Sequence, residues 1–264
     1  MSGVEALALG IVQGITEFFP VSSSGHLILL PRLFGWQQHS LAFDAVLHLG
    51  TGLAVLLYFW RDWLQMVRST ISDIRHRLLD TKSWSPHSRQ LLYIFVASIP
   101  AGVAGLLINS WVEANLRAPA IVAGTLLLVA LLMLFADTHR ASKSLAFDGA
   151  VVIGLSQVLA LVPGVSRSGI TMVAGLFCGL ARKDAARFSF LLSTPIVLAA
   201  GLWGLASSPL PATDYWLLTM ALFASFLTGL LAIKLFLRLL GRWGLLPFAV
   251  YRILLSLLLA VLLL

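Results

Sequence analysis

Long apolar stretches separated by short polar breaks run through the whole chain. A helix needs about 20 predominantly apolar residues to cross the hydrocarbon core of a membrane. Six stretches reach this length, and the pattern predicts a transmembrane helix for each of them. They are residues 41–60, 90–108, 118–136, 188–206, 214–233 and 245–264. The hydrophobic pattern therefore predicts an all-α polytopic membrane protein.

Four further apolar stretches are too short to cross a membrane. They are residues 3–18, 25–35, 149–162 and 168–180. They form two pairs, and each pair is interrupted by a polar turn, at residues 20–25 and 163–169. A proline ends the incoming helix, and serines can cap the helix that follows. We expect two re-entrant helical hairpins, because irregular backbone inside a membrane must be buried in protein or line a polar cavity.

The two interrupted regions resemble each other. A gapless shift of 144 residues makes six of the sixteen positions 10–25 identical to their counterparts, where random composition gives about one. This similarity predicts an internal repeat inside a single membrane domain, residues 1–264, with halves at 1–136 and 145–264.

The composition agrees with a membrane protein. Of the 264 residues, 59% are hydrophobic and 11% are charged, whereas soluble domains have about 25% charged residues. A water-facing globule is therefore excluded. The single cysteine, Cys178, excludes a disulfide scaffold and a cysteine metal site.

The basic residues predict the orientation. An odd number of expected spans lies between the two hairpins, so the repeats have inverted topology. Fourteen of the 18 Lys and Arg residues fall in loops on one side, including an arginine-rich loop at 61–89, and two fall on the other. The first side is then cytoplasmic, and the first hairpin opens outward. This distribution accounts for the net charge of +7 without a nucleic-acid partner.

Ionisable residues inside a membrane cost about 2.5–3.5 kcal/mol each on insertion scales, so they are functional candidates. In this chain they are Glu17, His26, Asp44, His48, Arg167 and Arg252. Gln13 and Glu17 share one face of the first short helix, because they are four residues apart. Glu17 and Arg167 belong to different halves, and each lies at or beside a polar turn.

A phosphate group suits such a pair of turns. Helix N-termini offer free N–H groups to an anion, and an arginine offers a bidentate fork. The second turn adds Ser166, Ser168 and Thr171 to Arg167. Glu17 repels a bare phosphate, so we interpret it as a metal ligand or as a general base. Capping alone is the other interpretation of the serines, and Asp44 and His48 are either partners of the site or a structural couple.

Two motifs identify a family. Gln13-x-x-x-Glu17 followed by residues 19–26 (FPVSSSGH) resembles the first motif of the undecaprenyl-diphosphate phosphatase family, also called the bacitracin-resistance family. Residues 163–171 (PGVSRSGIT) look like its second motif, PGxSRSxxT. Residues 47–51, 184–192 and 251–253 also resemble family segments, so the likeness covers essentially the whole chain.

The resemblance implies a multi-pass enzyme of the bacterial inner membrane whose active site opens to the periplasm. Its substrate is a polyprenyl diphosphate lipid: undecaprenyl diphosphate is hydrolysed to undecaprenyl phosphate and inorganic phosphate. This reaction recycles the lipid carrier for cell-wall synthesis and confers bacitracin resistance. The resemblance also implies re-entrant hairpins in inverted repeats and a divalent cation, Mg or Ca, as cofactor.

Carried onto this sequence, the resemblance makes Glu17 the essential carboxylate and the metal ligand. Ser23 and His26 become candidates for nucleophile or base, and Arg167 acts with them in catalysis. The residues expected to bind the substrate are Gln13, Ser22, Ser24, Gly164, Ser166, Ser168, Thr171 and Arg252. The family allows Glu or Gln at position 13, and Gln13 leaves one carboxylate fewer for a metal.

Two questions stay open at this point. The attacking group is either Ser23 or an activated water, with His26 as base or acid. A transporter or flippase of a lipid phosphate or small anion also uses inverted repeats with broken helices. Ser23 and His26 beside Glu17 favour the enzyme, because transport needs neither a nucleophile nor a base. The sequence also leaves open whether the protein forms a homodimer.

Overall fold

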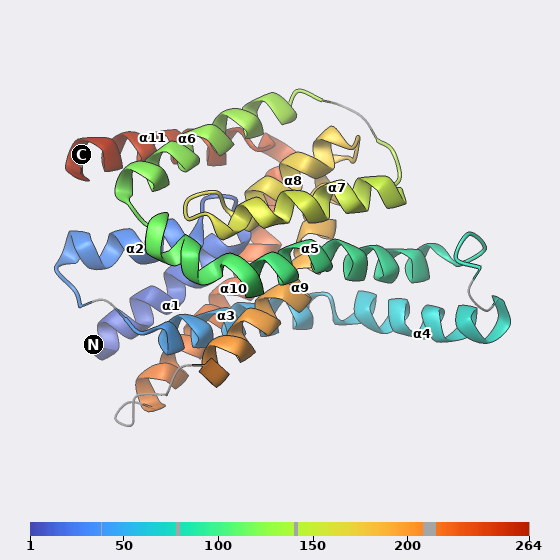
Figure 1. Cartoon of the computed structure of the whole chain (residues 1–264), viewed down its shortest axis with the longest axis horizontal. Helices are drawn as coiled ribbons and strands as arrows, with labels where there is room; N and C mark the ends of the chain where they lie inside the picture. Colours follow the sequence, from blue (N-terminus) through green and yellow to red (C-terminus); the bar gives the residue numbers. More distant parts are fainter. Residues whose placement is uncertain (38, 78–79, 140–141, 208–214, 264) are drawn as a thin grey trace.

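The structure is a computed structural model that describes residues 1–37, 39–77, 80–139, 142–207 and 215–263. These residues form helices and connecting turns, with no strand among them. Figure 1 shows the arrangement. In chain order the helices are α1 (Gly3–Phe18), α2 (Ser23–Phe34), α3 (Leu41–Tyr58), α4 (Trp60–Arg77), α5 (Pro86–Asn115), α6 (Pro119–Ala136), α7 (Phe147–Val158), η1 (Leu159–Leu161), α8 (Arg167–Phe177), α9 (Arg182–Ser207), α10 (Tyr215–Trp243) and α11 (Leu246–Leu263).

Five described helices are long and apolar enough to cross a membrane: α3, residues Pro86–Ile108 of α5, α6, α9 and α10. They coincide with five of the six expected spans. The sixth expected span, 245–264, corresponds to α11, whose apolar stretch Leu246–Val261 is shorter than a full span. The all-α class and the membrane character of the chain are thus confirmed.

The arginine-rich segment 61–89 is not a loop, as the sequence pattern had indicated. It contains α4 and the first turn of α5. Its charged residues mask a helical period, in which apolar side chains recur every three or four residues. α9 and α10 likewise extend into their charged ends, because Lys and Arg are good helix formers even outside an apolar stretch.

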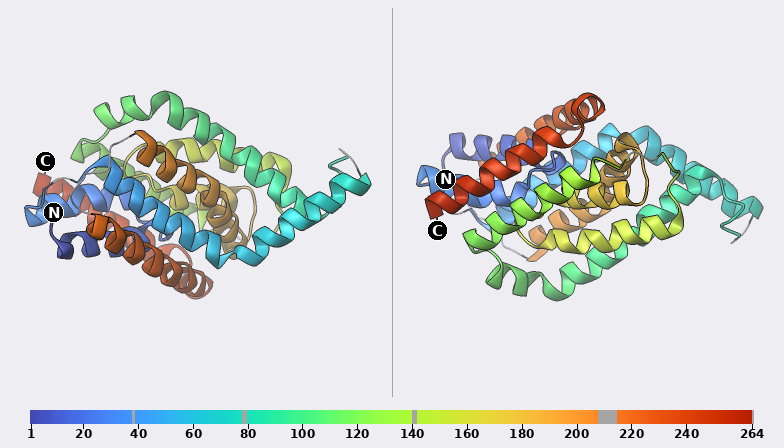
Figure 2. Two further views of the ribbon diagram at one scale, coloured as in Figure 1. Left: turned by 90° about the horizontal axis from the view of Figure 1, so that it is seen from below. Right: turned by 90° about the horizontal axis from the view of Figure 1, so that it is seen from above.

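The helices pack in pairs that join the two halves of the chain. α1 packs on α10 and α7 on α5, while α3 packs on both α9 and α10. α6 and α11 pack side by side along the upper edge of the molecule in Figure 1. The N- and C-termini lie at the same end of the molecule (Figures 1 and 2).

Glycine brings two of these helix pairs into close contact. A Cβ at Gly14 of α1 would lie 1.9 Å from Thr228 Oγ1 of α10, and one at Gly154 of α7 would lie 2.6 Å from the Ala97 backbone of α5. Small residues allow such approach where water supplies little drive for helix association. Both short helices before the turns are therefore held tightly against a long helix.

Aromatic side chains fill the core beneath the first turn. Phe18, at the end of α1, packs edge-on against Phe190 with ring centroids 5.4 Å apart. Phe190 in turn contacts Phe236, and Phe236 contacts Phe248. These residues come from α1, α9, α10 and α11, so the first turn rests on a rigid cluster formed by both halves.

Candidate functional site

Two serines cap the N-termini of the helices that follow the two turns, and both have the same strained backbone conformation. Ser22 has φ 75° and its Oγ accepts a hydrogen bond from the Gly25 N–H; Ser166 has φ 71° and its Oγ accepts one from the Gly169 N–H. Among the described residues, these two are the non-glycine positions with positive φ. Such conformations cost about 1–3 kcal/mol each and cluster at functional sites. The two positions are also equivalent under the 144-residue shift.

Glu17 connects the two turns. Its Oε1 accepts a hydrogen bond from Arg167 Nη2 at 2.7 Å. Its Oε2 accepts one from Ser23 Oγ at 2.9 Å and one from Gln13 Nε2 at 3.1 Å. Glu17 is buried, whereas Ser23 and Arg167 are partly exposed. The structure thus brings together four residues that the sequence analysis selected.

Arg167 is held by a neighbour that the sequence analysis did not single out. Its Nη1 donates to the backbone carbonyl of Ser189 on α9 at 3.2 Å. The Ser189 hydroxyl is 2.7 Å from Thr171 Oγ1, which also donates to the Arg167 carbonyl. Ser189 is fully buried. In the sequence it lies between two phenylalanines, and a hydroxyl at such an apolar position is the signal that could have indicated it.

Two further serines, Ser168 and Ser24, make contacts between the two turns and within them. Ser168 Oγ donates to the Phe19 carbonyl of the first turn at 3.3 Å and lies 3.2 Å from Ser166 Oγ. Ser24 is exposed, and its Oγ lies 3.3 Å from that of Ser22. Ser22 and Ser166 are therefore helix caps, but capping alone does not describe the serines, because Ser23 and Ser168 make other contacts.

His26 faces away from Ser23. Its Nδ1 is 2.7 Å from the Ser22 carbonyl, which can only accept, so Nδ1 carries the proton in the neutral ring. Its Nε2 then accepts from the Tyr251 hydroxyl at 2.7 Å, and the two rings stack 5.7 Å apart. Glu17, rather than His26, is therefore the hydrogen-bond partner of Ser23 among the described residues. Tyr251 was missed except as part of a family-like segment.

Arg252 holds the two turns together. It is fully buried and donates to backbone carbonyls of both turns: Pro20 at 3.1 Å, Gly164 at 2.8 Å and Val165 at 3.2 Å. It also reaches the carbonyls of Thr125 and Leu126 on α6. These contacts give Arg252 a positioning role, and its expected contact with the substrate stays a prediction.

Gly164 has a backbone role of the same kind. Its φ is +91°, and a Cβ there would lie 2.1 Å from Thr125 Oγ1 and 2.7 Å from the Val122 carbonyl oxygen. Only glycine combines this conformation with this closeness to α6. The prediction that Gly164 contacts the substrate stays a prediction.

The side chains of Asp44 and His48 do not pair with each other. The Asp44 carboxylate lies 2.7 Å from His39 Nε2, and His48 Nδ1 donates to the Asp44 backbone carbonyl at 2.8 Å. The expectation of a structural couple was therefore wrong in its partners. Helical spacing alone did not reveal His39, because that residue precedes the helix.

Oxygen atoms at Glu17 suit a hard cation. The described residues contain no group of three His, Cys, Asp or Glu side chains that could hold a metal. Gln13 Nε2 faces Glu17, so Gln13 Oε1 points away, and it is buried without a partner. One or two carboxylates, completed by substrate phosphates and water, are the usual protein share of a Mg²⁺ site. Glu17 supplies one such carboxylate, so it fits the cation that the family resemblance implies.

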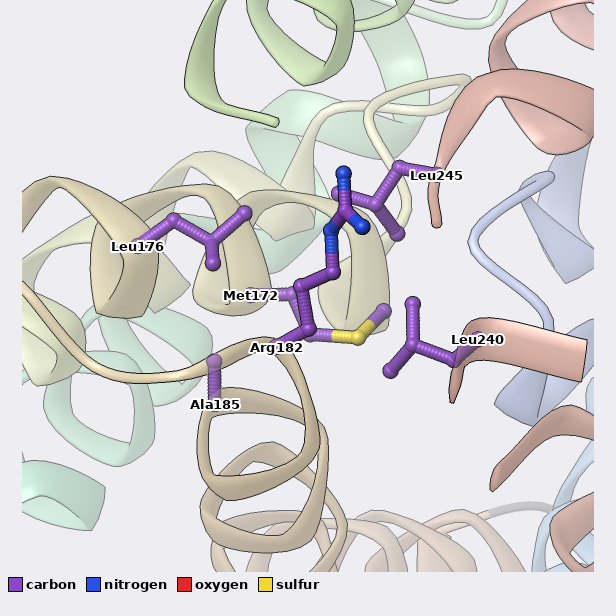
Figure 3. A pocket seen from close by; sticks show the side chains of 6 residues that line it. All are labelled: Met172, Leu176, Arg182, Ala185, Leu240 and Leu245. Atoms are coloured by element: carbon purple, nitrogen blue, oxygen red, sulfur yellow. The ribbon is translucent and has the colours of Figure 1, made fainter. Parts of the chain in front are cut away.

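A small cleft with no room for a water molecule lies between α8, α9 and the junction of α10 with α11 (Figure 3). Apart from Arg182 it is lined by apolar side chains, among them Met172 and Leu240. Arg182 is engaged by Asp137, with Nε 2.6 Å from Oδ1. This cleft therefore offers no free polar group for a phosphate.

The fold and the site together define a class: a helical membrane protein with a buried carboxylate, a serine hydroxyl and an arginine gathered where two capped turns meet. This arrangement suits chemistry on a phosphate group. A family profile described as "Bacitracin resistance protein BacA" matches residues 6–258. The chain belongs to this family.

Curated relatives extend along the same length. An undecaprenyl-diphosphatase of Alteromonas mediterranea is 43% identical over 259 residues, covering 96% of each chain. Those of Moorella thermoacetica and Hahella chejuensis are 44% and 42% identical over 261 residues, covering 97% of this chain and 96% of the relative. The resemblance seen in the two motifs therefore holds across the whole protein.

Proposed function

We propose that this chain is an undecaprenyl-diphosphatase that hydrolyses undecaprenyl diphosphate to undecaprenyl phosphate and inorganic phosphate. The full-length likeness to curated enzymes of this name supports the substrate. The observation that carries the proposal is the hydrogen bonding of Glu17 to both Ser23 and Arg167. The product renews the lipid carrier for cell-wall synthesis, which accounts for bacitracin resistance.

Ser23 is the nucleophile in this proposal, and Glu17 is its base. The Ser23 hydroxyl already donates to Glu17 Oε2, so the proton passes to the carboxylate as Oγ attacks the terminal phosphorus. The Oγ–P bond forms, the bond from that phosphorus to the bridging oxygen breaks, and undecaprenyl phosphate leaves. Water then cleaves the phosphoserine and releases inorganic phosphate. Direct attack by water is the alternative.

Charge on the phosphoryl oxygens is stabilised from the second turn. Arg167 reaches Glu17 at 2.7 Å, so a phosphate beside Ser23 lies within range of the guanidinium. The N-termini of α2 and α8 begin at the two turns and add their free N–H groups. Such preorganised donors are commonly the largest contribution to catalysis of this type.

The divalent cation, Mg or Ca, would be held by Glu17 together with the substrate phosphates. When bound, it neutralises phosphate charge and polarises the P–O bond. Gln13 contributes by orienting Glu17 through its Nε2 N–H group.

His26 serves the second half of the reaction. Tyr251 and the Ser22 carbonyl hold both ring nitrogens and fix the orientation of the ring. The attacking water would pass its proton to His26 Nε2 through the Tyr251 hydroxyl. We assign Tyr251 as a positioning residue for His26.

The membrane arrangement that we propose has α11 as the sixth span, and α1–α2 and α7–α8 as re-entrant hairpins in inverted repeats. The matching pairs α1–α10 and α7–α5, together with the two identical caps, support it. The excess of basic residues on one side favours the inner membrane with the first hairpin open to the periplasm. A homodimer stays a prediction.

The deciding experiment measures phosphate release from undecaprenyl diphosphate by the protein purified in detergent, with and without a chelator. We expect release that the chelator abolishes and added Mg²⁺ or Ca²⁺ restores. Rapid acid quench should trap phosphate on Ser23 in the wild type and none in Ser23→Ala. Full activity of Ser23→Ala would favour the attack of water, and no release under any metal condition would favour a transporter.

A further inference from the structure

His48 on α3 has one ring nitrogen that the packing of the molecule leaves open. Its Nδ1 lies 2.8 Å from the Asp44 backbone carbonyl, which can only accept, so Nδ1 carries a proton. Its Nε2 has no hydrogen-bond partner among the described residues, and His48 is partly exposed. His26 differs in this respect, because Tyr251 and the Ser22 carbonyl hold both of its ring nitrogens.

The exposed part of His48 is not on the leucine face of α3. Beyond His48, the exposed leucines of this helix are Leu53, Leu56 and Leu57, which are 36–51% exposed. At 100° per residue, His48 lies about 130° from the middle of that face. It is closer in angle to Thr51, which is fully buried and donates to the His48 carbonyl at 3.0 Å. His48 therefore belongs to the polar side of the helix.

The packing of α1 and α3 on α10 brings the helix of Glu17 close to the helix of His48. A Cβ at Gly14 of α1 would lie 2.7 Å from the Ser225 carbonyl oxygen, and one at Gly50 of α3 would lie 1.9 Å from the Ser225 hydroxyl oxygen. Both helices thus approach the same residue of α10. α3 itself lies between α9 and α10 in the view from below (Figure 2, left).

The charges around Glu17 leave a phosphate ligand short of cations. Arg167 is paired with Glu17 at 2.7 Å, so its charge is matched before a substrate binds. Arg252 is engaged by backbone carbonyls of both turns. A diphosphate brings several further negative charges. After Arg167, His48 is the ionisable side chain with the strongest electrostatic effect on Glu17, so it lies within range of a phosphate beside Ser23.

We propose that His48 is a further phosphate-binding residue of this site, whose Nε2 donates a hydrogen bond to an oxygen of the diphosphate. Because Nδ1 keeps its proton on the Asp44 carbonyl, donation from Nε2 requires the imidazolium, which the negative phosphate stabilises. Arg167 then binds the diphosphate from the second turn, and His48 binds it from α3. This inference rests on the proposed phosphatase function, which supplies the diphosphate as ligand.

The test compares two replacements of His48 in the full chain purified in detergent. Glutamine places its amide nitrogen near the position of Nε2, whereas asparagine places its amide nitrogen near the position of Nδ1 and keeps a donor for the Asp44 carbonyl. Isothermal titration with methylenediphosphonate, whose P–C–P bridge is not hydrolysed, measures binding without turnover. His48→Asn should bind it roughly 10- to 100-fold more weakly, as expected for loss of one charge-assisted hydrogen bond. His48→Gln keeps a neutral donor and should lose only about five- to tenfold.

Kinetics give the same comparison with the lipid substrate. The KM for phosphate release from a prenyl diphosphate should rise in the same order, with kcat changed less than about threefold, because His48 binds the ground state and the transition state alike. The matched control is His76→Asn, on an exposed part of α4, which should keep the wild-type affinity and KM.

Wild-type affinity and KM in His48→Asn would overturn the proposal. A smaller loss in His48→Asn than in His48→Gln would also overturn it, because that order is expected if His48 only supports α3 through Asp44. Normal phosphate release with these results removes the role of His48 alone. The expected order of methylenediphosphonate affinities without any phosphate release would support His48 as a phosphate ligand and contradict the phosphatase function.

Discussion

The first turn and the second turn use the same capped serine at positive φ, yet they carry different chemistry. Where the first has Ser23, the second has Arg167; where the first has Glu17, the second has Leu161. His26 corresponds to Ile170 in the same way. In the proposed mechanism the duplicated backbone is divided in function: the first turn supplies the nucleophile and the base, and the second supplies the arginine that binds phosphate.

This division explains why both halves are needed. Glu17 receives Ser23 from its own turn and Arg167 from the other, so neither turn alone assembles the site. Gln13 and Gln157 are one of the pairs that have not diverged, and both are buried. In the first half Gln13 orients the Glu17 carboxylate. In the second half the position equivalent to Glu17 is Leu161, which has no carboxylate.

The largest loss of activity should come from removing the proposed base, Glu17, of the first turn. Glu17→Gln keeps the shape of the side chain but cannot take the Ser23 proton or hold a cation with a negative charge. We expect kcat to fall roughly 10³- to 10⁴-fold, measured as phosphate release from a prenyl diphosphate. Glu5→Gln, at the start of the same helix, should stay near wild type. Substantial activity in Glu17→Gln would exclude Glu17 as the base.

The second largest loss of activity should come from removing the Arg167 guanidinium of the second turn. Arg167→Ala is expected to lower kcat roughly 10²- to 10³-fold, in the range for loss of one preorganised donor. Arg167→Lys should retain part of this activity, because lysine keeps the charge without the fork that spans Glu17 and the Ser189 carbonyl. Equal rates for the two variants would show that a positive charge without the fork contributes nothing.

Loosening the connection between the turns should have a smaller effect, and mainly on stability. Arg252→Lys keeps a buried cation but cannot reach carbonyls of both turns and of α6 at once. We expect a loss of about 2 kcal/mol in stability, read as a lower unfolding temperature in detergent. Arg32→Lys, at the exposed end of α2, is the control. An unchanged unfolding temperature for Arg252→Lys would contradict the positioning role of Arg252.

The smallest effect should come from Tyr251→Phe, which keeps the stacked ring and removes the hydroxyl. Loss of one hydrogen bond to His26, about 1 kcal/mol, should lower kcat about fivefold with KM unchanged. Tyr215→Phe, at the exposed start of α10, should not alter either constant. A change confined to KM would place Tyr251 in substrate binding and not in the positioning of His26.

Local pattern was enough for much of the fold. Apolar length alone located α3, α6, α9 and α10, since a span of hydrocarbon must be matched by a run of apolar residues. The proline–serine breaks located both turns, because they interrupt a helix whatever surrounds it. α4 was not predicted as a helix, because its apolar residues are spread along one face and are outnumbered by charged and polar residues.

The site was predictable in its members but not in its connections. Glu17, Ser23 and Arg167 could be selected because charge and hydroxyl groups are rare in such a chain, and the two motifs are specific. That Ser23 donates to Glu17 and His26 to the Ser22 carbonyl depends on side-chain rotamers set by tertiary packing. Nothing in the spacing of Asp44 and His48 indicated that Asp44 would pair with His39.

By itself, the sequence determined the class of the protein, its helices, its two turns and the residues able to carry the chemistry, because these follow from hydrophobicity, helix period and backbone restrictions of nearby residues. Only the tertiary structure decided that Arg252 holds both turns, that Tyr251 occupies His26 and that Ser189 supports Arg167. The physical reason is distance along the chain: these contacts join residues from 22 to 232 positions apart. They exist only once the helices have packed.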